Sequence, residues 1–299
     1  MALSGLKFKD FIKAEANPVF GGAEIGTCFD VYVAPENGRY RLDFSWRPQK
    51  ALAVTCSSDG INWDEPVITL RENPASGWED AVNRNCVLKI GKTYKMWYTG
   101  QANGGSCIGY AESDDGLNFQ RIRKDPVLVP ESDFEKESVM NPCVLYDNGI
   151  YKMWYAAGET YEPNVLAYAE SRDGICWQKS VINPVFTCDV NNYYEKDRVG
   201  GCQVLKTPDM GYLMFYIGYE DINTARICIA QSDDGISNWK RYEHNPVLSP
   251  DAGKWDADSC YKPSVLWDEN RKVWLLWYNG RKGSDEYIGL AEREGRGFF

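Results

Sequence analysis

The sequence contains a single histidine, His244, and its ten cysteines include no Cys-x-x-C pair. Zinc sites combine cysteine and histidine at such short spacings, so we expect no zinc site, and the sequence specifies no other metal or cofactor. Cys86 and Cys143 instead occupy equivalent places in the internal repeat described below, which suits a small, buried, apolar residue.

Long apolar runs and positive charge are also scarce. No stretch approaches the roughly 20 apolar residues of a membrane-spanning helix, and the N-terminal MALSGLKFKDF lacks the apolar core of a secretory signal. The formal net charge of −10 disfavours general binding of nucleic acid or anionic membranes. We therefore expect a cytoplasmic protein with neither of these partners, and the sequence leaves its oligomeric state open.

Aromatic residues, by contrast, are abundant, with 11 Trp, 19 Tyr and 11 Phe. This aromatic content, beside a modest number of leucines, favours strands over helices. A chain of 299 residues forms one large domain or two small ones. Internal repeats in the sequence distinguish between these two possibilities.

The sequence carries an internal repeat in five copies. The phrase YKMWYTG from Tyr94 returns as YKMWYAAG from Tyr151, YLMFYIG from Tyr212 and VWLLWYNG from Val273, with a weaker YRLDFSW from Tyr40. A short apolar segment precedes each copy, and a third segment such as IGYAESDDG follows it. Short segments of alternating polarity, separated by Gly, Asn or Asp, are typical of antiparallel hairpins.

In four copies a fourth segment follows and ends in a Pro-Val phrase such as DPVLVP. The fifth copy ends at Phe299 without one, whereas the N-terminal segment around Leu6 to Phe20 carries NPVF. Four strands per repeat are typical of a β-propeller blade. We therefore predict an all-β fold, a single five-bladed β-propeller over residues 1–299 with four-stranded antiparallel blades. The N-terminal strand should complete the last blade, which leaves no blade edge exposed.

An S-x-D-G phrase joins the third and fourth segments in four copies, as in SSDGINW and SDDGLNF, and contains Asp59, Asp115, Asp173 and Asp234. The phrase resembles the Asp-box of sialidases. Its repetition favours a turn over a catalytic role, with the Asp bonded to its own backbone and the Gly supplying a positive φ. The aromatic residue at its end should then pack between blades.

Residues that bind a ligand should be irregular at otherwise equivalent places around the mouth of a propeller. Aligned on their inner strands, the five copies carry at one position Asp30, Arg84, Asn141, Gly201 and Lys262. Four residues before this position, four copies carry Asp80, Glu137, Asp197 and Asp258. Two interpretations of the recurring aspartates stay open. Each could cap the start of its strand, or Asp80 could bind a sugar hydroxyl or tune a pKa, with Asp197 and Arg198 forming a second sugar contact.

Over nearly all its length the chain resembles the five-bladed propeller glycoside hydrolases. This superfamily holds arabinanases and β-xylosidases (family 43), invertases and levanases (family 32) and mannoside phosphorylases (family 130). The likeness rests on YKMWYTG, IGYAESDDGLNF and NPVL, which are scaffold phrases and therefore indicate the superfamily well and the activity poorly. Families 43 and 32 carry a general base or nucleophilic Asp on the first inner strand, and Asp30 in CFDVYV matches it, with Val31 in place of the family 43 proline. Where these families have further acids, this chain has Arg84 and Asn141.

Cleavage of a glycosidic bond by such enzymes needs two carboxyl groups, one acid and one base or nucleophile. The resemblance makes Asp30 the base or nucleophile. Glu137 is the first candidate for the acid, and Glu159, between the second and third segments of the same repeat, is the alternative.

Basic residues at mouth positions suggest anion binding, and they are Arg47, Arg84, Arg198, Lys262 and Arg281. Singly, each would more often pair with a carboxylate. Together they can bind phosphate or a uronate, because arginine offers a planar bidentate fork. Tyr261, beside Lys262, and Trp46 are candidates for stacking on a sugar ring, and Asn141 completes the predicted substrate-binding set.

The leading hypothesis is a glycoside hydrolase that acts on plant or microbial oligosaccharides. A phosphorylase that uses inorganic phosphate is the first alternative, suggested by the basic mouth. A carbohydrate-binding propeller without catalysis is the second, suggested by the acids missing from the second and third blades. The sugar, its linkage and the outcome at the anomeric carbon stay open.

Overall fold

The computed structural model describes residues 11–159 and 163–299. The regular structure in this part of the chain is β, apart from the short 3-10 turns η1 (Arg47–Gln49), η2 (Pro74–Ser76) and η3 (Asp133–Glu135). None of its helices has the length and apolar character needed to cross a membrane. The all-β prediction is confirmed.

The strands pair antiparallel in groups of four. The first unit contains β2 (Cys28–Glu36), β3 (Arg39–Trp46), β4 (Ala51–Ser57) and β5 (Val67–Arg71). The second contains β6 (Ala81–Ile90), β7 (Thr93–Ala102), β8 (Gly105–Ser113) and β9 (Gln120–Arg121). The third contains β10 (Ser138–Asp147), β11 (Ile150–Gly158), β12 (Pro163–Ser171) and β13 (Gln178–Lys179). The fourth contains β14 (Arg198–Thr207), β15 (Gly211–Asp221), β16 (Thr224–Ser232) and β17 (Lys240–Arg241). The fifth contains β18 (Ser259–Asp268), β19 (Val273–Lys282), β20 (Asp285–Glu294) and β1 (Ile12–Lys13).

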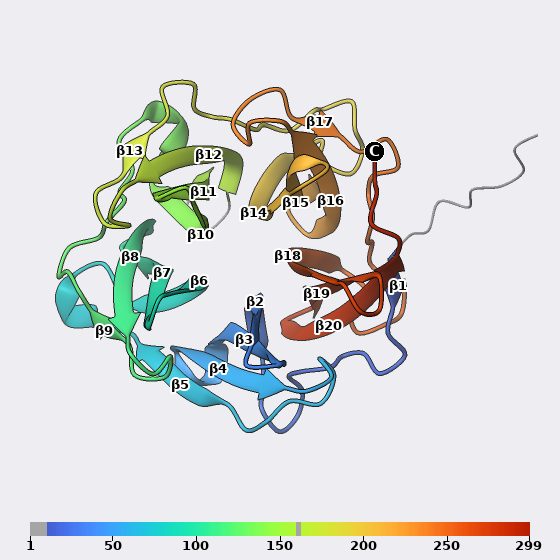
Figure 1. Ribbon diagram of the computed structural model, residues 1–299, viewed down its shortest axis with the longest axis horizontal. Helices are drawn as coiled ribbons and strands as arrows, with labels where there is room; N and C mark the ends of the chain where they lie inside the picture. The colour runs from blue at the N-terminus through green and yellow to red at the C-terminus, as the bar shows by residue number, and fades with distance from the viewer. Residues whose placement is uncertain (1–10, 160–162) are drawn as a thin grey trace, which may run out of the picture.

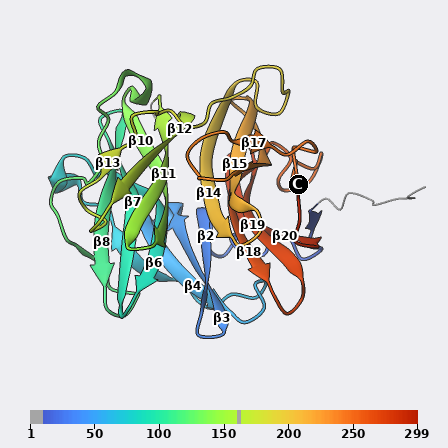
Figure 2. The ribbon, with the colours of Figure 1, turned by 45° about the horizontal axis from the view of Figure 1, so that its top comes forward.

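These units stand around a common centre, with the first strand of each unit innermost (Figure 1). Figure 2 shows the same ring tilted, with the sheets standing next to one another around that centre. A single parallel pair, Ser106 with Ser138, joins the second and third units into one eight-stranded sheet. The arrangement brings five inner strands, far apart in sequence, to one place.

Side chains of four inner strands accept hydrogen bonds from the backbone of the next inner strand. The N–H of Val144 donates to Cys86 Sγ at 3.3 Å, and the N–H of Val204 donates to Cys143 Sγ at 3.2 Å. Between the fifth and first units, the N–H of Val33 donates to Ser264 Oγ at 2.7 Å. Cys86 and Cys143 are buried and free, as their shared place in the repeat predicts.

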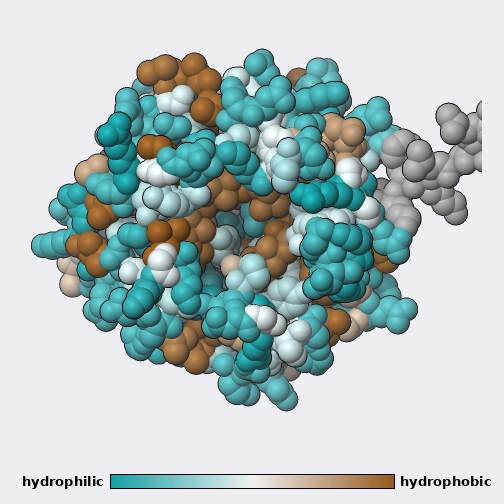
Figure 3. Space-filling model, in the orientation of Figure 1, coloured by the Kyte–Doolittle hydropathy of each residue, from teal (hydrophilic) through white to brown (hydrophobic). Residues whose placement is uncertain are grey.

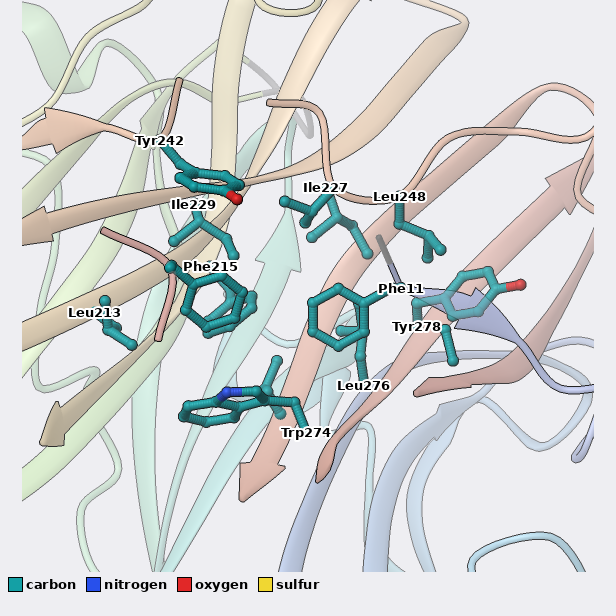
Figure 4. Packing of buried hydrophobic residues seen from close by; sticks show 14 of the residues in the cluster. Phe11, Leu213, Phe215, Ile227, Ile229, Tyr242, Leu248, Trp274, Leu276 and Tyr278 are labelled. Atoms are coloured by element: carbon teal, nitrogen blue, oxygen red, sulfur yellow. The ribbon is translucent and has the colours of Figure 1, made fainter. Parts of the chain in front are cut away.

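The N-terminal segment completes the C-terminal sheet, as predicted from its Pro-Val phrase. Strand β1 pairs antiparallel with β20, and Phe20 forms a further bridge with Ile288. Phe11 inserts between the fourth and fifth units, where it packs among Phe215, Tyr278 and other buried side chains (Figure 4). Leu6, at the start of the predicted segment, lies outside the described residues.

A fully buried carboxylate recurs in four units, at Glu79, Glu135, Glu195 and Asp256. Each accepts a hydrogen bond from a tyrosine on the second strand of its unit, namely Tyr98, Tyr155, Tyr216 and Tyr278. Each also pairs with a cation from the outermost strand, namely Arg121, Lys179, Arg241 and Lys13. The acid that recurs in a structural role is therefore this buried carboxylate. The aspartates for which the sequence left a strand-capping role open are exposed, namely Asp80, Asp197 and Asp258. An aromatic residue directly precedes each buried acid, a signal present in the sequence.

The S-x-D-G phrases form the predicted turns. Asp173 Oδ1 accepts hydrogen bonds from the N–H groups of Ile175 and Cys176, both at 2.8 Å, and Gly174 has a φ of +81°. The indole of Trp97, from the second unit, donates to the Gly174 carbonyl at 2.8 Å and contacts Trp177 of the same phrase. The phrase therefore also connects neighbouring sheets.

Replacing Asp173 by Asn should make the thermal stability of the protein depend less on pH in acid solution. Hydrogen bonds, that from the Cys176 N–H first, lower the pKa of Asp173 from 3.8 to about 2. The stability that this carboxylate contributes is thus complete above about pH 4 and lost as the pH falls through about 2. Between these values, thermal unfolding midpoints should fall less for Asp173→Asn than for the wild type. The exposed Asp125→Asn is the control, and parallel profiles for Asp173→Asn and wild type would contradict the assignment.

Candidate active site

Four inner strands share one irregularity where they face the centre. In β2, β6, β10 and β18 the pairing with the second strand skips two residues, as between Phe29 and Tyr32. The first skipped residue adopts a left-handed conformation without being glycine: Asp30 (φ 59°), Arg84 (φ 53°), Asn141 (φ 54°) and Lys262 (φ 50°). Such conformations are uncommon, and bulges that re-aim a side chain occur often beside active sites. These are the residues that the sequence alignment placed at one equivalent position.

The fourth unit departs from this pattern in a way that leaves space. Strand β14 skips a single residue, Gly201. A Cβ atom at Gly201 would lie 2.7 Å from Cγ of Asn141, so any side chain there would displace the Asn141 amide. The glycine therefore keeps one side of the centre open.

A cavity of about 320 Å³, here called the central cavity, lies over these residues. Seven of the predicted site residues line it: Asp30, Arg47, Arg84, Asn141, Tyr261, Lys262 and Arg281. The surface of the molecule is hollowed at the centre of the ring (Figure 3). The volume is at the lower end of the range of small-molecule sites.

Asp30 is held at the wall of the central cavity by the neighbouring strand. Its side chain is buried, with 3% of the residue exposed, and Oδ2 accepts a hydrogen bond from Ser45 Oγ at 2.9 Å. The same Ser45 oxygen accepts the backbone N–H of Arg84 at 3.1 Å, and Arg84 Nε lies 3.9 Å from Asp30 Oδ1. Ser45 thereby couples the orientation of the acid to that of the adjacent arginine.

Lys262 is the least compensated charge in the central cavity. It is 5% exposed, and its ammonium has neither a hydrogen bond nor an ion pair within residues 11–159 and 163–299. Burial raises the pKa values of the Cys86 and Cys143 thiols to about 12, and the nearby positive charge of Lys262 partly opposes this rise. Burying an unpaired ammonium is costly, so this position favours an anionic ligand.

The arginines of the central cavity have different partners. Arg47 forms an ion pair with Glu286 and lies over the Phe29 ring, 4.6 Å from its centroid. Arg281 donates to neutral acceptors, the Asn223 carbonyl at 2.6 Å and Ser259 Oγ at 3.3 Å. Within the described residues, four cationic side chains therefore line the central cavity beside two carboxylates, Asp30 and Glu286, in a protein whose net charge is −10.

Glu286 is a site residue that sequence reasoning missed. It is buried and accepts a hydrogen bond from the Tyr261 hydroxyl. Burial, and then the Glu286 charge, raise the pKa of Tyr261 well above 10.0, so the phenol keeps its proton. By strand pairing, the counterparts of Glu286 in the second, third and fourth units are Ser106, Pro163 and Ala225. Aligning the third strands of the repeats, as well as the inner strands, would have singled out this acid.

The remaining predicted residues lie away from the central cavity. Asp80 lines a second cavity, whereas Glu137, Glu159, Asp197 and Arg198 line neither cavity within the described residues. Glu159 pairs with Lys136 at 2.8 Å, a contact that lowers the pKa of Glu159, opposite to the direction that a general acid needs. Arg198 pairs with Asp197 at 2.6 Å. The acid roles of Glu137 and Glu159 stay predictions.

Metal binding has no evident place in the described residues, where no group of three or more His, Cys, Asp and Glu side chains is arranged to hold an ion. The described residues supply the central cavity with carboxylates, cations, an amide and a phenol.

Among known proteins, no family model matches the chain. An uncharacterized protein of Mycobacterium tuberculosis is 26% identical over 90% of this chain and 89% of its own length. A 1,2-beta-oligomannan phosphorylase of Thermoanaerobacter sp. is 32% identical over 61% of this chain and 55% of its own length.

Solved structures of two activities resemble the fold to nearly the same degree. The beta-1,2-mannobiose phosphorylase from Listeria innocua superposes with a TM-score of 0.72 at 16% identity, over 95% of this chain and 96% of that one. A thermostable family-43 glycoside hydrolase superposes with a TM-score of 0.70 at 17% identity, over the same shares. At such identities the likeness shows the fold alone. It confirms the resemblance drawn from the sequence, and the chain has the propeller fold that glycoside hydrolases share with the mannoside phosphorylases of family 130.

Proposed function

We propose that this chain is a five-bladed propeller enzyme that cleaves a glycosidic bond of an oligosaccharide by transferring the sugar to inorganic phosphate. The observation that carries the proposal is the charge of the central cavity. Lys262 has no partner in the described residues, and Arg281 donates there to neutral acceptors. Phosphate is a small anion that lysine and arginine side chains bind well.

Phosphate also changes the number of carboxyl groups that the reaction needs. An oxygen of phosphate forms the new bond to the anomeric carbon while the glycosidic C–O bond breaks, so no protein base or nucleophile is required. Only the departing oxygen needs a proton, which Asp30 donates, and the hydroxyl proton of the hydrogen phosphate then restores the acid form of Asp30. The products are a sugar 1-phosphate and an oligosaccharide one residue shorter. Lys262 and Arg84 hold the phosphate and stabilise its charge during the transfer.

Hydrolysis, predicted first from the sequence, is the second candidate. It is supported by the presence of two carboxyl groups, Asp30 and Glu286, in the same cavity. Asp30 would act as base or nucleophile, and Glu286, rather than Glu137 or Glu159, as acid. The contacts of Glu286 with Arg47 and Tyr261 disfavour this, because both would have to release it before it could protonate a leaving group.

The two phosphorylases found by comparison carry 1,2-beta-oligomannan and beta-1,2-mannobiose in their names, so β-1,2-mannosides are the first substrates to test. The protein is incubated with β-1,2-mannobiose, β-1,4-mannobiose, xylobiose and arabinobiose, each with and without inorganic phosphate. We expect a sugar 1-phosphate from one of them, formed only with phosphate. Free sugar formed at a rate independent of phosphate would establish hydrolysis instead.

Replacing Lys262 by Met should raise KM for phosphate about 10- to 100-fold, because a hydrogen bond to a charged group contributes about 1.5–3 kcal/mol. KM for the sugar should change far less. Thermal stability should stay equal or rise, since the variant removes an unpaired buried charge. Lys92→Met, in the turn between β6 and β7, is the matched control. An unchanged KM for phosphate would remove Lys262 from the phosphate site.

A further inference from the structure

A second cavity, here called the side cavity, continues from the central cavity between the first and second units. Its volume is about 310 Å³. It shares Phe29, Arg47 and Arg84 with the central cavity, so a ligand chain leaving the centre passes these three residues. The proposed reaction does not use this space.

An amide pair forms the polar wall of the side cavity. Asn83 Nδ2 donates to Gln101 Oε1 at 2.6 Å, and Gln101 Nε2 donates to Ser106 Oγ at 3.3 Å. Arg84 Nη1 donates to Asn83 Oδ1 at 3.1 Å, which connects the pair to the central cavity. Amides both donate and accept hydrogen bonds, as sugar hydroxyls do.

Asn83 and Gln101 occupy positions that line the central cavity in other units. By strand pairing, Asn83 corresponds to Phe29 and Tyr261, and Gln101 corresponds to Arg281. Each of these counterparts lines the central cavity. The second unit thus presents amides where the first and fifth units present aromatic and cationic groups, and these amides line the side cavity.

The rest of the side cavity carries charges of both signs. Asp80 and Glu72 line it together with Arg47, Lys50 and Arg84. Glu72 Oε2 is buried without a hydrogen-bond donor in the described residues, so a sugar hydroxyl can donate to it. Trp46 adds an aromatic surface whose position is fixed by a hydrogen bond from Nε1 to the Ile25 carbonyl at 2.9 Å.

We propose that the side cavity binds one further sugar residue of the substrate, recognised through the Asn83–Gln101 amide pair. The inference rests on the proposed function, because it extends the same site. An oligosaccharide of three residues then fills both cavities, and a disaccharide fills the central cavity alone. The enzyme favours oligosaccharides longer than two residues.

The test compares β-1,2-mannobiose with β-1,2-mannotriose. Relative to the wild type, Gln101→Met should lower the ratio of kcat/KM for the trisaccharide to that for the disaccharide about 5- to 10-fold, the effect of one or two lost hydrogen bonds. Gln120→Met, in the outer strand β9, should leave the ratio unchanged. An equal loss on both substrates, or no loss on either, would overturn the proposal.

Calorimetric titration of both sugars separates this inference from the proposed reaction, because binding needs no turnover. Wild-type protein should bind the trisaccharide more tightly than the disaccharide, and Gln101→Met should remove most of the difference. Equal affinity of the wild type for the two sugars would refute the side-cavity site even if phosphate-dependent cleavage were observed. Tighter trisaccharide binding without any turnover would support the site and refute the proposed reaction.

Discussion

Replacing Asp30 by Asn is expected to lower kcat/KM about 10²- to 10⁴-fold, the range that a positioned general acid or base contributes. The asparagine can still accept the Ser45 hydrogen bond, so the wall of the central cavity should keep its shape. The variant loses only the proton that the leaving oxygen requires. The measurement is kcat/KM on the substrate identified by the panel, together with the thermal unfolding midpoint.

The control for this variant is Asp64→Asn. Asp64 belongs to the same unit, but it is exposed and pairs with Arg39 on the outer surface at 2.7 Å. Both variants should unfold at nearly the wild-type temperature, and only Asp30→Asn should lose activity. If Asp30→Asn retained activity within about twofold of the wild type, Asp30 would be neither the acid of phosphorolysis nor the base of hydrolysis.

Replacing Lys13 by Met is expected to lower the free energy of unfolding by about 3–5 kcal/mol, because it leaves a buried carboxylate without its cation. Lys13 Nζ lies 2.6 Å from Asp256 Oδ2, and the Asp256 side chain is 1% exposed. The pair fastens the N-terminal segment to the last sheet beside Phe11, whose ring is buried in the adjoining core (Figure 4). Urea unfolding of both proteins measures the difference.

Two further variants make the Lys13 result interpretable. Arg39→Met breaks the exposed Arg39–Asp64 pair and should cost less than about 1 kcal/mol. The double variant Lys13→Met with Asp256→Asn should recover much of the lost stability, because the unpaired buried charge is gone. A Lys13→Met protein no less stable than Arg39→Met would show that the ion pair does not hold the ring closed.

Local phrases carried most of the fold prediction. YKMWYTG lies within β7 and its second copy within β11, because alternating polarity and flanking turns leave such segments little choice except a hairpin strand. The N-terminal Pro-Val phrase predicted the pairing of β1 with β20. The alignment also found Asp30 and Lys262, since residues at a shared bulge stand out when their chemistry differs.

The parts of the candidate site that the sequence did not predict depend on the exact path of the loops. Glu137 was the first candidate for the acid, yet η3 turns Glu135 inward to Lys179, and the positive φ of Lys136 leaves Glu137 exposed. The local signal that distinguishes the two glutamates is Phe134, the aromatic residue directly before Glu135. Glu286 was missed for a different reason, because it lies on a third strand, which was not aligned, and its ion-pair partner Arg47 comes from the first unit.

The measurement that tests the central claim most directly is the stoichiometry of phosphate consumption by the wild-type protein. Inorganic phosphate and intact oligosaccharide are followed together during one reaction with the substrate that the panel identifies. The account predicts that one phosphate disappears for every glycosidic bond broken, with a sugar 1-phosphate as the product. Bond cleavage that consumes no phosphate would contradict it.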